Sequence, residues 1–455
     1  MQTRKKFIQL IMKILPTIGP ASEKPEDLKF LFNYCTMVRL NTSHNSISWH
    51  KKMITLIKRL NKKIDILVDI PGVKPRTNNK NDIHIKKNDI VEFGRYQKKA
   101  GNKFIELTRE LPSIKSKSIK SFSLDDGKIL FKIIKFNSNI IAGKATHDCI
   151  IQPKKGLNIA NSVYNNNQQK KIYIQYLNKF RKTKINAVGL SFVQNKELII
   201  YLKKKFSKFL MISKIENSEG LKNADEICKF SDAIMIDRGD LSAEIGENNL
   251  YDAILKIANL TKKYGKPLIM ATENLETMSK SINPTKNDII SLGFSNQINS
   301  DIIMLSEETA SSNNWKKIIL WLNKFLISKK NKLHTEIDEN IFWKTVDLIR
   351  DYTLVVFTKK GLMLDKIFKK SLENDVFVFT DTKKTKSISN FYKNASCFLT
   401  KKIDNRNINK FYYDNIKKHK KIIFSKTNKV FLIAISFPKK NSTANTLSLI
   451  NKKDI

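Results

Sequence analysis

The sequence predicts an α/β protein: a (β/α)8 barrel with a β-rich domain inserted after the third barrel strand and a C-terminal α/β domain. Two observations support this fold class. Eight short, almost continuously apolar runs recur along the first 310 residues, and amphipathic helical segments separate most of them. Such runs are typical of strands buried on both faces, as in parallel sheets covered by helices. An open, doubly wound sheet is the alternative that this pattern leaves.

The apolar runs predict the barrel strands, and the amphipathic segments between them predict the barrel helices. Three helices are expected at 48–63, 195–206 and 315–330, because apolar residues recur there at helical spacing. The eight expected strands are IMKILPT (11–17), MVRLN (37–41), IDILVDI (64–70), NAVGLSF (186–192), LMISKIE (210–216), DAIMIDRGD (232–240), PLIMATE (267–273) and DIIMLSEE (301–308).

Two further regions do not fit the barrel pattern. The gap between the third and fourth strands is too long for one helix, and residues 126–146 alternate with period two, which predicts a small β-rich domain. After residue 335 a new set of strands begins, namely TLVVFT, DVFVFT, SCFLT and KVFLIAISF. We therefore expect a barrel of residues 1–77 and 161–335, an inserted domain of 78–160 and a C-terminal domain of 336–455.

The composition is strongly basic, with a formal net charge of +42 and 84 Lys and Arg residues against 42 Asp and Glu. Only 10 of the 84 are Arg, so 74 are Lys, and these lysines are scattered through every segment without forming a stripe. We interpret them as a whole-chain compositional bias and expect solvated lysines rather than a nucleic-acid-binding surface. Each remaining Arg is of interest because a planar, bidentate guanidinium cannot be replaced by an ammonium.

The cysteines and the apolar runs indicate the cellular compartment of the protein. Cys35, Cys149, Cys228 and Cys397 are far apart and form no CxxC pair, which argues against a zinc site or a disulfide framework. No run reaches the 18 apolar residues that a membrane helix needs, and no cleavage site follows the basic N-terminal segment. We expect a cytoplasmic protein with no membrane contact.

Polar side chains gather where the predicted strands end. In a barrel the carboxyl ends of the strands converge on the face that carries chemistry. The polar residues at these ends are Arg39, Asn41, Ser43, His44, Asp69, Arg76, Ser191, Lys214, Glu216, Arg238, Asp240, Thr272, Ser306 and Glu308. Arg238 can equally stabilise its loop, His44 can lie at the edge of the core, and Ser191 can be structural.

The types of these residues indicate phosphoryl transfer. Lys214 and Glu216 lie two apart on an extended segment and so share a face. Glu216 and Asp240 follow adjacent strands, and Mg²⁺ with one or two carboxylates and substrate oxygens is the usual reason for carboxylates to converge. Arg39, Arg76 and Lys214 supply positive charge for phosphate oxygens. No glycine-rich Walker loop is present, so a nucleotide is not held in that way.

Nine ordered segments resemble the pyruvate kinase family, over residues about 13–320. They are KILPTIGPAS, VRLNTSH, VDIPGVKPRT, SLDDG, KKGLNIAN, SKIENSEGL, DRGDLSAEIG, MATENLETM and MLSEETA. The C-terminal third matches weakly, chiefly through KKNSTANTLSL. The resemblance implies a TIM barrel and a cytoplasmic, homotetrameric glycolytic enzyme. Its reaction would transfer the phosphoryl group of phosphoenolpyruvate to ADP, giving pyruvate and ATP with Mg²⁺.

The resemblance also implies catalytic roles for individual residues. Lys214 and Arg39 would contact the transferring phosphoryl group, and Glu216 and Asp240 would hold Mg²⁺. Backbone amides at Gly239 and Asp240 would bind the substrate carboxylate at a helix N-terminus. Thr272, with help from Ser306 and Glu308, would deliver the proton to the enolate carbon.

Other residues would bind the nucleotide and a second cation, again by resemblance. The nucleotide would face Asn41, His44, Arg76 and Lys155. A K⁺ site would be formed by Asn41, Ser43, Asp69 and the carbonyl of Ile70. Asp125 and Asp126 would lie on the inserted domain, which in this family closes over the site and excludes water.

Several positions depart from the family pattern. Asp237 and Ser242 replace small residues and Glu273 replaces an amide; we expect Asp237 to weaken binding of the substrate carboxylate. Lys74 stands where potassium-dependent members carry glutamate, so we expect weak or absent K⁺ activation. The loop TKKGLML (358–364) offers apolar side chains where an effector loop needs donors, so we expect no sugar-phosphate activation.

Two functions of other classes remain as alternatives. One is a catalytically decayed barrel that acts as a basic RNA- or partner-binding protein, for which the charge of +42 is the argument. The other is a phosphoenolpyruvate-binding barrel lyase, which would need no nucleotide. Dependence of the reaction on ADP separates the kinase from the lyase.

Overall fold

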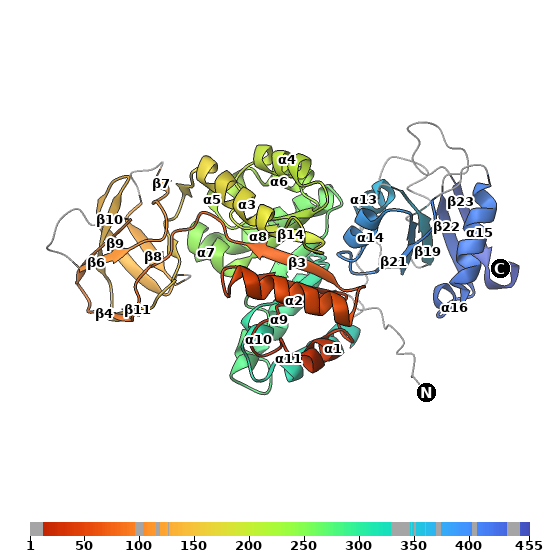
Figure 1. The fold of residues 1–455 in the computed structure, drawn as a ribbon, viewed down its shortest axis with the longest axis horizontal. Helices are drawn as coiled ribbons and strands as arrows, with labels where there is room; N and C mark the ends of the chain where they lie inside the picture. The colour runs from red at the N-terminus through yellow and green to blue at the C-terminus, as the bar shows by residue number, and fades with distance from the viewer. Residues whose placement is uncertain are drawn as a thin grey trace.

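The structure is a computed structural model in which three regions follow one another along the long axis of the molecule (Figure 1). It describes residues 12–95, 103–114, 119–125, 127–328, 346, 348–349, 352–359, 361–369, 375–402, 407–434 and 446–455. The central region is a barrel, the region coloured orange is rich in β-strands, and the blue region at the other side is the C-terminal α/β unit.

The central region is a parallel barrel, as the sequence predicts. Within the described residues its strands follow the order β1-β18-β17-β16-β15-β14-β3-β2, and the bridge between Thr17 and Arg39 closes the ring. These strands are β1 (Lys13–Pro16), β2 (Met37–Asn41), β3 (Asp65–Ile70), β14 (Ala187–Leu190), β15 (Leu210–Lys214), β16 (Ala233–Asp237), β17 (Leu268–Ala271) and β18 (Ile302–Leu305). The closed ring excludes the open, doubly wound sheet.

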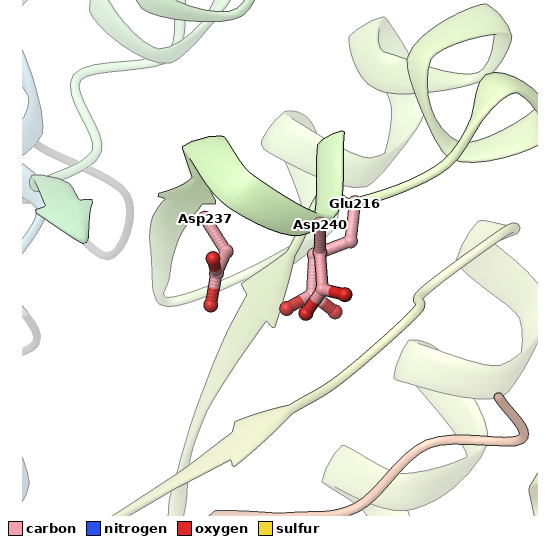
Figure 2. Close-up of side chains that lie close together, drawn as sticks. All are labelled: Glu216, Asp237 and Asp240. Atoms are coloured by element: carbon pink, nitrogen blue, oxygen red, sulfur yellow. The ribbon is translucent and has the colours of Figure 1, made fainter. Parts of the chain in front are cut away.

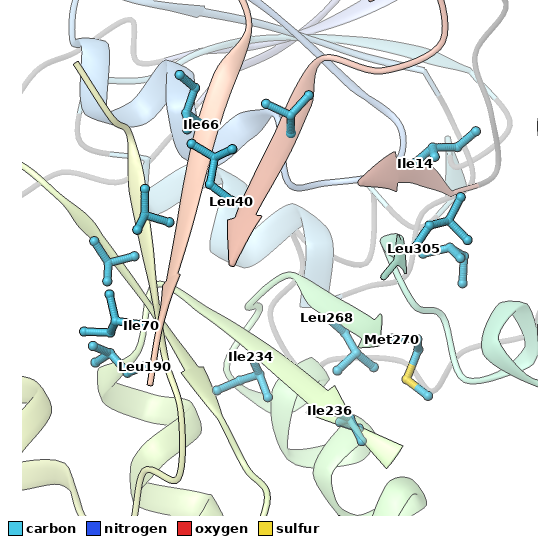
Figure 3. Close-up of a cluster of buried hydrophobic side chains, with 14 of the residues drawn as sticks. Ile14, Leu40, Ile66, Ile70, Leu190, Ile234, Ile236, Leu268, Met270 and Leu305 are labelled. Carbon is cyan, nitrogen blue, oxygen red and sulfur yellow. The ribbon is translucent and has the colours of Figure 1, made fainter. Parts of the chain in front are cut away.

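Alternate residues of each strand face opposite sides of the barrel wall. Ile66 and Ile70 of β3 point outward and join the large core between the strands and the surrounding helices (Figure 3). Leu67, between them, points inward and packs with Met235 of β16 and other residues of the barrel interior. Both faces of the wall are therefore buried, which explains why the strands read as continuous apolar runs.

Helices surround the barrel, and several of them begin at a side-chain cap. Ser46 caps α2 by accepting a hydrogen bond from the Trp49 amide at 3.1 Å, and Asn195 caps α4 through the Leu198 amide at 3.1 Å. These helices are α1 (Pro25–Leu31), α2 (Ile47–Leu60), α3 (Asn166–Phe180), α4 (Lys196–Lys205), α5 (Ser218–Lys222), α6 (Ala224–Phe230), α7 (Arg238–Ile245), α8 (Leu250–Lys263), α9 (Lys286–Gln297), α10 (Glu307–Ala310) and α11 (Trp315–Ser328), with 3₁₀ turns η1 (Glu247–Asn249) and η2 (Glu276–Ser279).

The insertion between β3 and β14 is rich in β-strands, as predicted. Its main sheet has the order β12-β8-β9-β10-β5-β6 and encloses a core around Phe93, Phe122 and Phe131. The strands are β4 (Ile83–Ile85), β5 (Ile90–Gly94), β6 (Lys103–Glu106), β7 (Ser113–Ile114), β8 (Ser121–Leu124), β9 (Ile129–Phe136), β10 (Ile140–Ala145), β11 (Cys149–Ile151), β12 (Leu157–Asn158) and β13 (Ser162–Val163). The proposed domain boundaries at 77/78 and 160/161 stay a prediction.

The C-terminal region forms a mixed sheet of order β21-β20-β19-β22-β23, with β23 antiparallel. The four predicted strands here are present, and β23 is an addition. The elements are β19 (Thr353–Phe357), α13 (Leu362–Lys369), β20 (Val376–Thr380), α14 (Lys383–Ser389), β21 (Ala395–Leu399), α15 (Ile408–Lys418), α16 (Lys420–Ile423), β22 (Lys429–Ala434), β23 (Thr446–Asn451) and η3 (Lys452–Asp454). Most of the segment KKNSTANTLSL lies outside the described residues.

The C-terminal region contacts the barrel at the amino ends of its strands. The side chain of Phe391 is 1% exposed and belongs to the cluster of the barrel interior, beside residues such as Leu15 and Ala233. Lys13 Nζ donates to the carbonyls of Ser389 and Ala395, at 3.3 Å each. Phe391 therefore fills the end of the barrel opposite to the predicted site. Among the described residues, no helix is long and apolar enough to cross a membrane.

Candidate active site

Several of the predicted site residues lie at the carboxyl ends of the barrel strands, around the side chain of Lys214. Lys214 is the last residue of β15 and is 4% exposed. Its Nζ lies 2.7 Å from Glu216 Oε1 and 3.3 Å from both Asp69 Oδ2 and Asp237 Oδ2. Burial alone would lower the pKa of Lys214, but the three carboxylates outweigh it and raise this pKa well above its usual value. Lys214 is therefore a permanent buried cation.

Arg39 contributes the second buried cation. It lies in β2, is 5% exposed, and directs Nε and Nη2 to Asp69 Oδ2 at 3.0 and 2.7 Å. Its Nη1 donates to Thr17 Oγ1 at 2.9 Å, next to the bridge that closes the barrel. Burial raises the pKa of Asp69, but Lys214 and Arg39 outweigh it and hold this pKa below the usual value. Asp69 thus orients both cations.

Three carboxylates lie together beside Lys214, on two neighbouring strand ends. Glu216 follows β15, Asp237 ends β16, and Asp240 lies in the first turn of α7. One oxygen of each lies within 4.8 Å of the others, and the three side chains point the same way (Figure 2). Burial raises the pKa of Glu216 to about 8 although Lys214 opposes the shift. A hard cation would relieve this concentration of negative charge, so the donor set fits Mg²⁺.

Asp240 already has a cationic neighbour in the structure. Lys74 Nζ lies 2.5 Å from Asp240 Oδ1, and the Lys74 side chain is 3% exposed. Burial raises the pKa of Asp240, but Lys74 and then Lys214 reverse the shift and lower it. Asp69, which the sequence analysis assigned to a K⁺ site, contacts Arg39 and Lys214. The K⁺ assignment of Asn41, Ser43, Asp69 and Ile70 stays a prediction.

Thr272 lies directly after β17, in a left-handed conformation with φ of 61°. Its hydroxyl is 3.1 Å from Asp237 Oδ1, and it accepts from the backbone amides of Arg238 and Gly239 at 3.1 and 3.3 Å. The Arg238 guanidinium contacts the Thr272 carbonyl and Asn274 Oδ1, so it holds the loop that carries Thr272. This contact fits the structural role that the sequence left open for Arg238.

Ser306 and Glu308 follow β18. The Ser306 amide donates to Glu308 Oε2 at 2.6 Å, and burial raises the pKa of Glu308. Glu308 is 2% exposed, and its Oε1 accepts no hydrogen bond from the residues that the structure describes. A buried carboxyl with a raised pKa beside Ser306 is suited to holding a proton, although that role stays a prediction.

The residues assigned to the nucleotide are more exposed. Arg76 Nη1 donates to the Lys154 carbonyl at 3.0 Å, and Lys155 pairs with Asp125 at 2.8 Å within the inserted region. Ser43 and His44 are exposed after β2. Asp126 lies outside the described residues. The nucleotide-binding roles of Asn41, His44, Arg76 and Lys155 stay predictions.

Two residues that lie inside the site had no role predicted from the sequence. Asp237 appeared only as a departure, yet it joins the carboxylate group and contacts Lys214 and Thr272. Thr17 was not considered, although it receives a hydrogen bond from Arg39. The spacing of Asp237 and Asp240, one helical turn apart at the start of α7, is the signal that could have identified the first of these.

Comparisons with known proteins agree with this geometry. The family model described as pyruvate kinase, barrel domain, matches residues 10–319. A pyruvate kinase of Buchnera aphidicola subsp. Schizaphis graminum is 32% identical over 321 residues, covering 66% of this chain and 66% of the relative. That match therefore spans just under two thirds of the relative's length. A pyruvate kinase of Thermotoga maritima is 24% identical over 470 residues, covering 96% of this chain and 98% of the relative.

A solved structure supports the same fold over the whole length. The crystal structure of pyruvate kinase from Pyrobaculum aerophilum has a TM-score of 0.79 and 19% sequence identity, covering 97% of this chain and 99% of that one. At this identity the likeness establishes the fold alone. The family model, however, covers more than half of the 455 residues. The chain belongs to the pyruvate kinase family.

Proposed function

We propose that the protein is a pyruvate kinase that transfers the phosphoryl group of phosphoenolpyruvate to ADP and yields pyruvate and ATP. The observation that carries this proposal is the position of Lys214. Its buried ammonium lies 2.7 Å from Glu216, which belongs to the carboxylate group that fits Mg²⁺. An ammonium and a metal site on one face can hold the same phosphoryl group, whose charge must be stabilised during transfer.

Glu216 and Asp240 would hold Mg²⁺, which when bound neutralises charge on the substrate oxygens. Lys214 and Arg39 bind and orient the phosphoryl group from the side of β2 and β15. Asp69 fixes both cations, because it contacts Arg39 at 2.7 Å and Lys214 at 3.3 Å. These positions are set by strand ends within the barrel wall, so they cost little reorganisation when the substrate binds.

The opposite side of the site would handle the substrate carboxylate and the proton. The amides of Gly239 and Asp240 lie in the first turn of α7, where the helix dipole favours an anion. The Thr272 hydroxyl accepts hydrogen bonds from the amides of Arg238 and Gly239, and the Arg238 guanidinium contacts the Thr272 carbonyl. Thr272 would deliver a proton to the enolate carbon, and Ser306 and Glu308 would assist it in this transfer.

Lys74 supports a reaction that needs little K⁺. A fixed ammonium 2.5 Å from Asp240 supplies positive charge at this edge of the site without a mobile ion. The inserted region, which carries Lys155 and Asp125, would cover the site and exclude water. Binding of ADP and assembly into homotetramers are further parts of the proposal, and they rest on the family.

The test is ADP-dependent formation of pyruvate from phosphoenolpyruvate with Mg²⁺, in the presence and absence of K⁺. The Lys214→Met variant should lose at least about 100- to 1,000-fold in kcat, because a buried charge that stabilises the transferring group is removed. Lys203→Met is the matched control: Lys203 also pairs with a carboxylate, Asp232, at 2.8 Å, but outside the site. Its kcat should stay within about twofold of wild type.

Other outcomes would redirect the proposal. Turnover of phosphoenolpyruvate without ADP would favour the lyase alternative. Folded protein without any turnover would favour the decayed barrel that binds RNA or a partner. A rate that rises strongly with K⁺ would contradict the role that we give to Lys74.

A further inference from the structure

Asp237 occupies a position where an aspartate normally caps a helix, but it does not act as a cap. It is the N-cap residue of α7, and its side chain makes no capping hydrogen bond. Aspartate at this position usually accepts a hydrogen bond from the second or third amide of the helix. The Asp237 carboxylate instead lies on the side of Glu216 and Asp240 (Figure 2). Its orientation therefore serves something other than the helix end.

The contacts of Asp237 place it within the site and away from solvent. The residue is 6% exposed, with Oδ2 3.3 Å from Lys214 Nζ and Oδ1 3.1 Å from the Thr272 hydroxyl. A third buried carboxylate beside two others raises the electrostatic cost of the metal-free site. That cost is recovered when a divalent cation binds, because each added carboxylate ligand strengthens the attraction.

Lys74 acts in the opposite direction. Its ammonium lies 2.5 Å from Asp240 Oδ1, with both side chains largely buried. A divalent cation that uses Asp240 must share this carboxylate with a fixed positive charge nearby. Repulsion between the two cations in a buried, water-poor site lowers the affinity for the metal. The site therefore needs negative charge beyond Glu216 and Asp240 to keep a divalent cation.

We propose that Asp237 is a third protein ligand of the divalent cation and offsets the positive charge that Lys74 places on Asp240. The inference rests on the proposed function, since the metal site is that of the same reaction. The two residues have opposite effects: Asp237 tightens metal binding and Lys74 weakens it. Because both are protein groups, the metal should bind without phosphoenolpyruvate or ADP.

The test measures Mn²⁺ binding directly, by electron paramagnetic resonance of the free ion, with protein but no substrate. We expect Asp237→Asn to weaken binding about tenfold or more, which is the scale of losses at supporting residues of metal sites. Lys74→Met should tighten binding by a similar factor, and the double variant should lie between the two. Asp252→Asn is the matched control, because it removes one exposed carboxylate from α8 and should leave the affinity unchanged.

Defined outcomes overturn the proposal. If Asp237→Asn binds Mn²⁺ as wild type does, Asp237 is not a ligand. If that variant also binds phosphoenolpyruvate more tightly, Asp237 instead opposes the substrate carboxylate. Asp237→Ser and thermal unfolding guard against misfolding, since a folded Ser variant must show the same loss. Catalytically inactive protein whose Mn²⁺ affinity still depends on Asp237 would overturn the proposed function and support this inference.

Discussion

The two ends of the barrel bury charged side chains in opposite ways. At the amino end, Asp301 accepts hydrogen bonds from the amides of Leu268 and Lys393, at 2.9 and 3.2 Å. At the carboxyl end, Glu308 keeps one buried oxygen, Oε1, that accepts no hydrogen bond from the described residues. A buried carboxylate whose oxygens accept hydrogen bonds contributes to the structure. A buried carboxylate oxygen that accepts none destabilises the fold unless a bound ligand supplies the missing partner.

This difference indicates that the two ends of the same strands have different roles. The amino ends contact the C-terminal region, and the carboxyl ends form the candidate site. The amino end is closed by Phe391 and tied to the C-terminal region through Asp65, which receives a hydrogen bond from Asn390 at 2.5 Å. The carboxyl end gathers Lys214, Arg39 and their carboxylate partners. Substitutions at the amino end should therefore affect stability, and those at the carboxyl end should affect turnover.

The largest expected effect on stability is at Phe391. Phe391→Ala removes a fully buried ring from the barrel interior and should lower the free energy of unfolding by about 3–5 kcal/mol. The kcat of the folded fraction should stay within about twofold, because the ring lies at the end opposite to the site. Urea unfolding and steady-state kinetics measure the two quantities. A loss of stability under about 1 kcal/mol would show that Phe391 does not anchor the two regions.

A smaller effect is expected from pH, through Asp301. Burial raises the pKa of Asp301 from 3.8 to about 6. The associated stability is fully present below about pH 4 and is lost as the pH rises through about 6. Between pH 5 and 7 the wild type should therefore lose about 1 kcal/mol of unfolding free energy through this group. Urea midpoints at both values measure the loss.

The control for that measurement is Asp301→Asn, which cannot ionise. Its stability should change less between pH 5 and 7 than that of the wild type, even if its absolute stability is lower. Lys13 should not interfere, because burial lowers its pKa only to about 8. Equal pH dependence in the two proteins would mean that Asp301 is not the titrating group.

The smallest expected effect is that of a sugar phosphate. In the C-terminal region Met363 is 4% exposed and packs in the core, so it presents no donor to an anion. Lys360 and the side chain of Leu362 lie outside the described residues. Fructose bisphosphate should change the half-saturating concentration of phosphoenolpyruvate by less than about twofold. A larger change would show that the C-terminal region communicates with the site through an effector.

The elements that the sequence predicted are those with a local signal. The barrel strands are buried on both faces, so their apolar runs were visible, and the residues after them could be assigned to one face. The Lys74–Asp240 contact joins residues 166 positions apart, and no local pattern encodes it. The same holds for Phe391 in the barrel. The orientation of Asp237 depends on its contacts with Lys214 and Thr272, which its sequence neighbours do not specify.

The pairing of β1 with β18 also has a consequence during synthesis. Lys13 lies opposite Ile302, so 289 residues separate the two strands that meet next to the closure. At about 5–20 residues per second, the first strand waits about 15–60 s on the ribosome for its partner. Throughout that time its hydrogen-bonding edge is open to other chains. The formal net charge of +42 adds electrostatic repulsion between such unfinished chains.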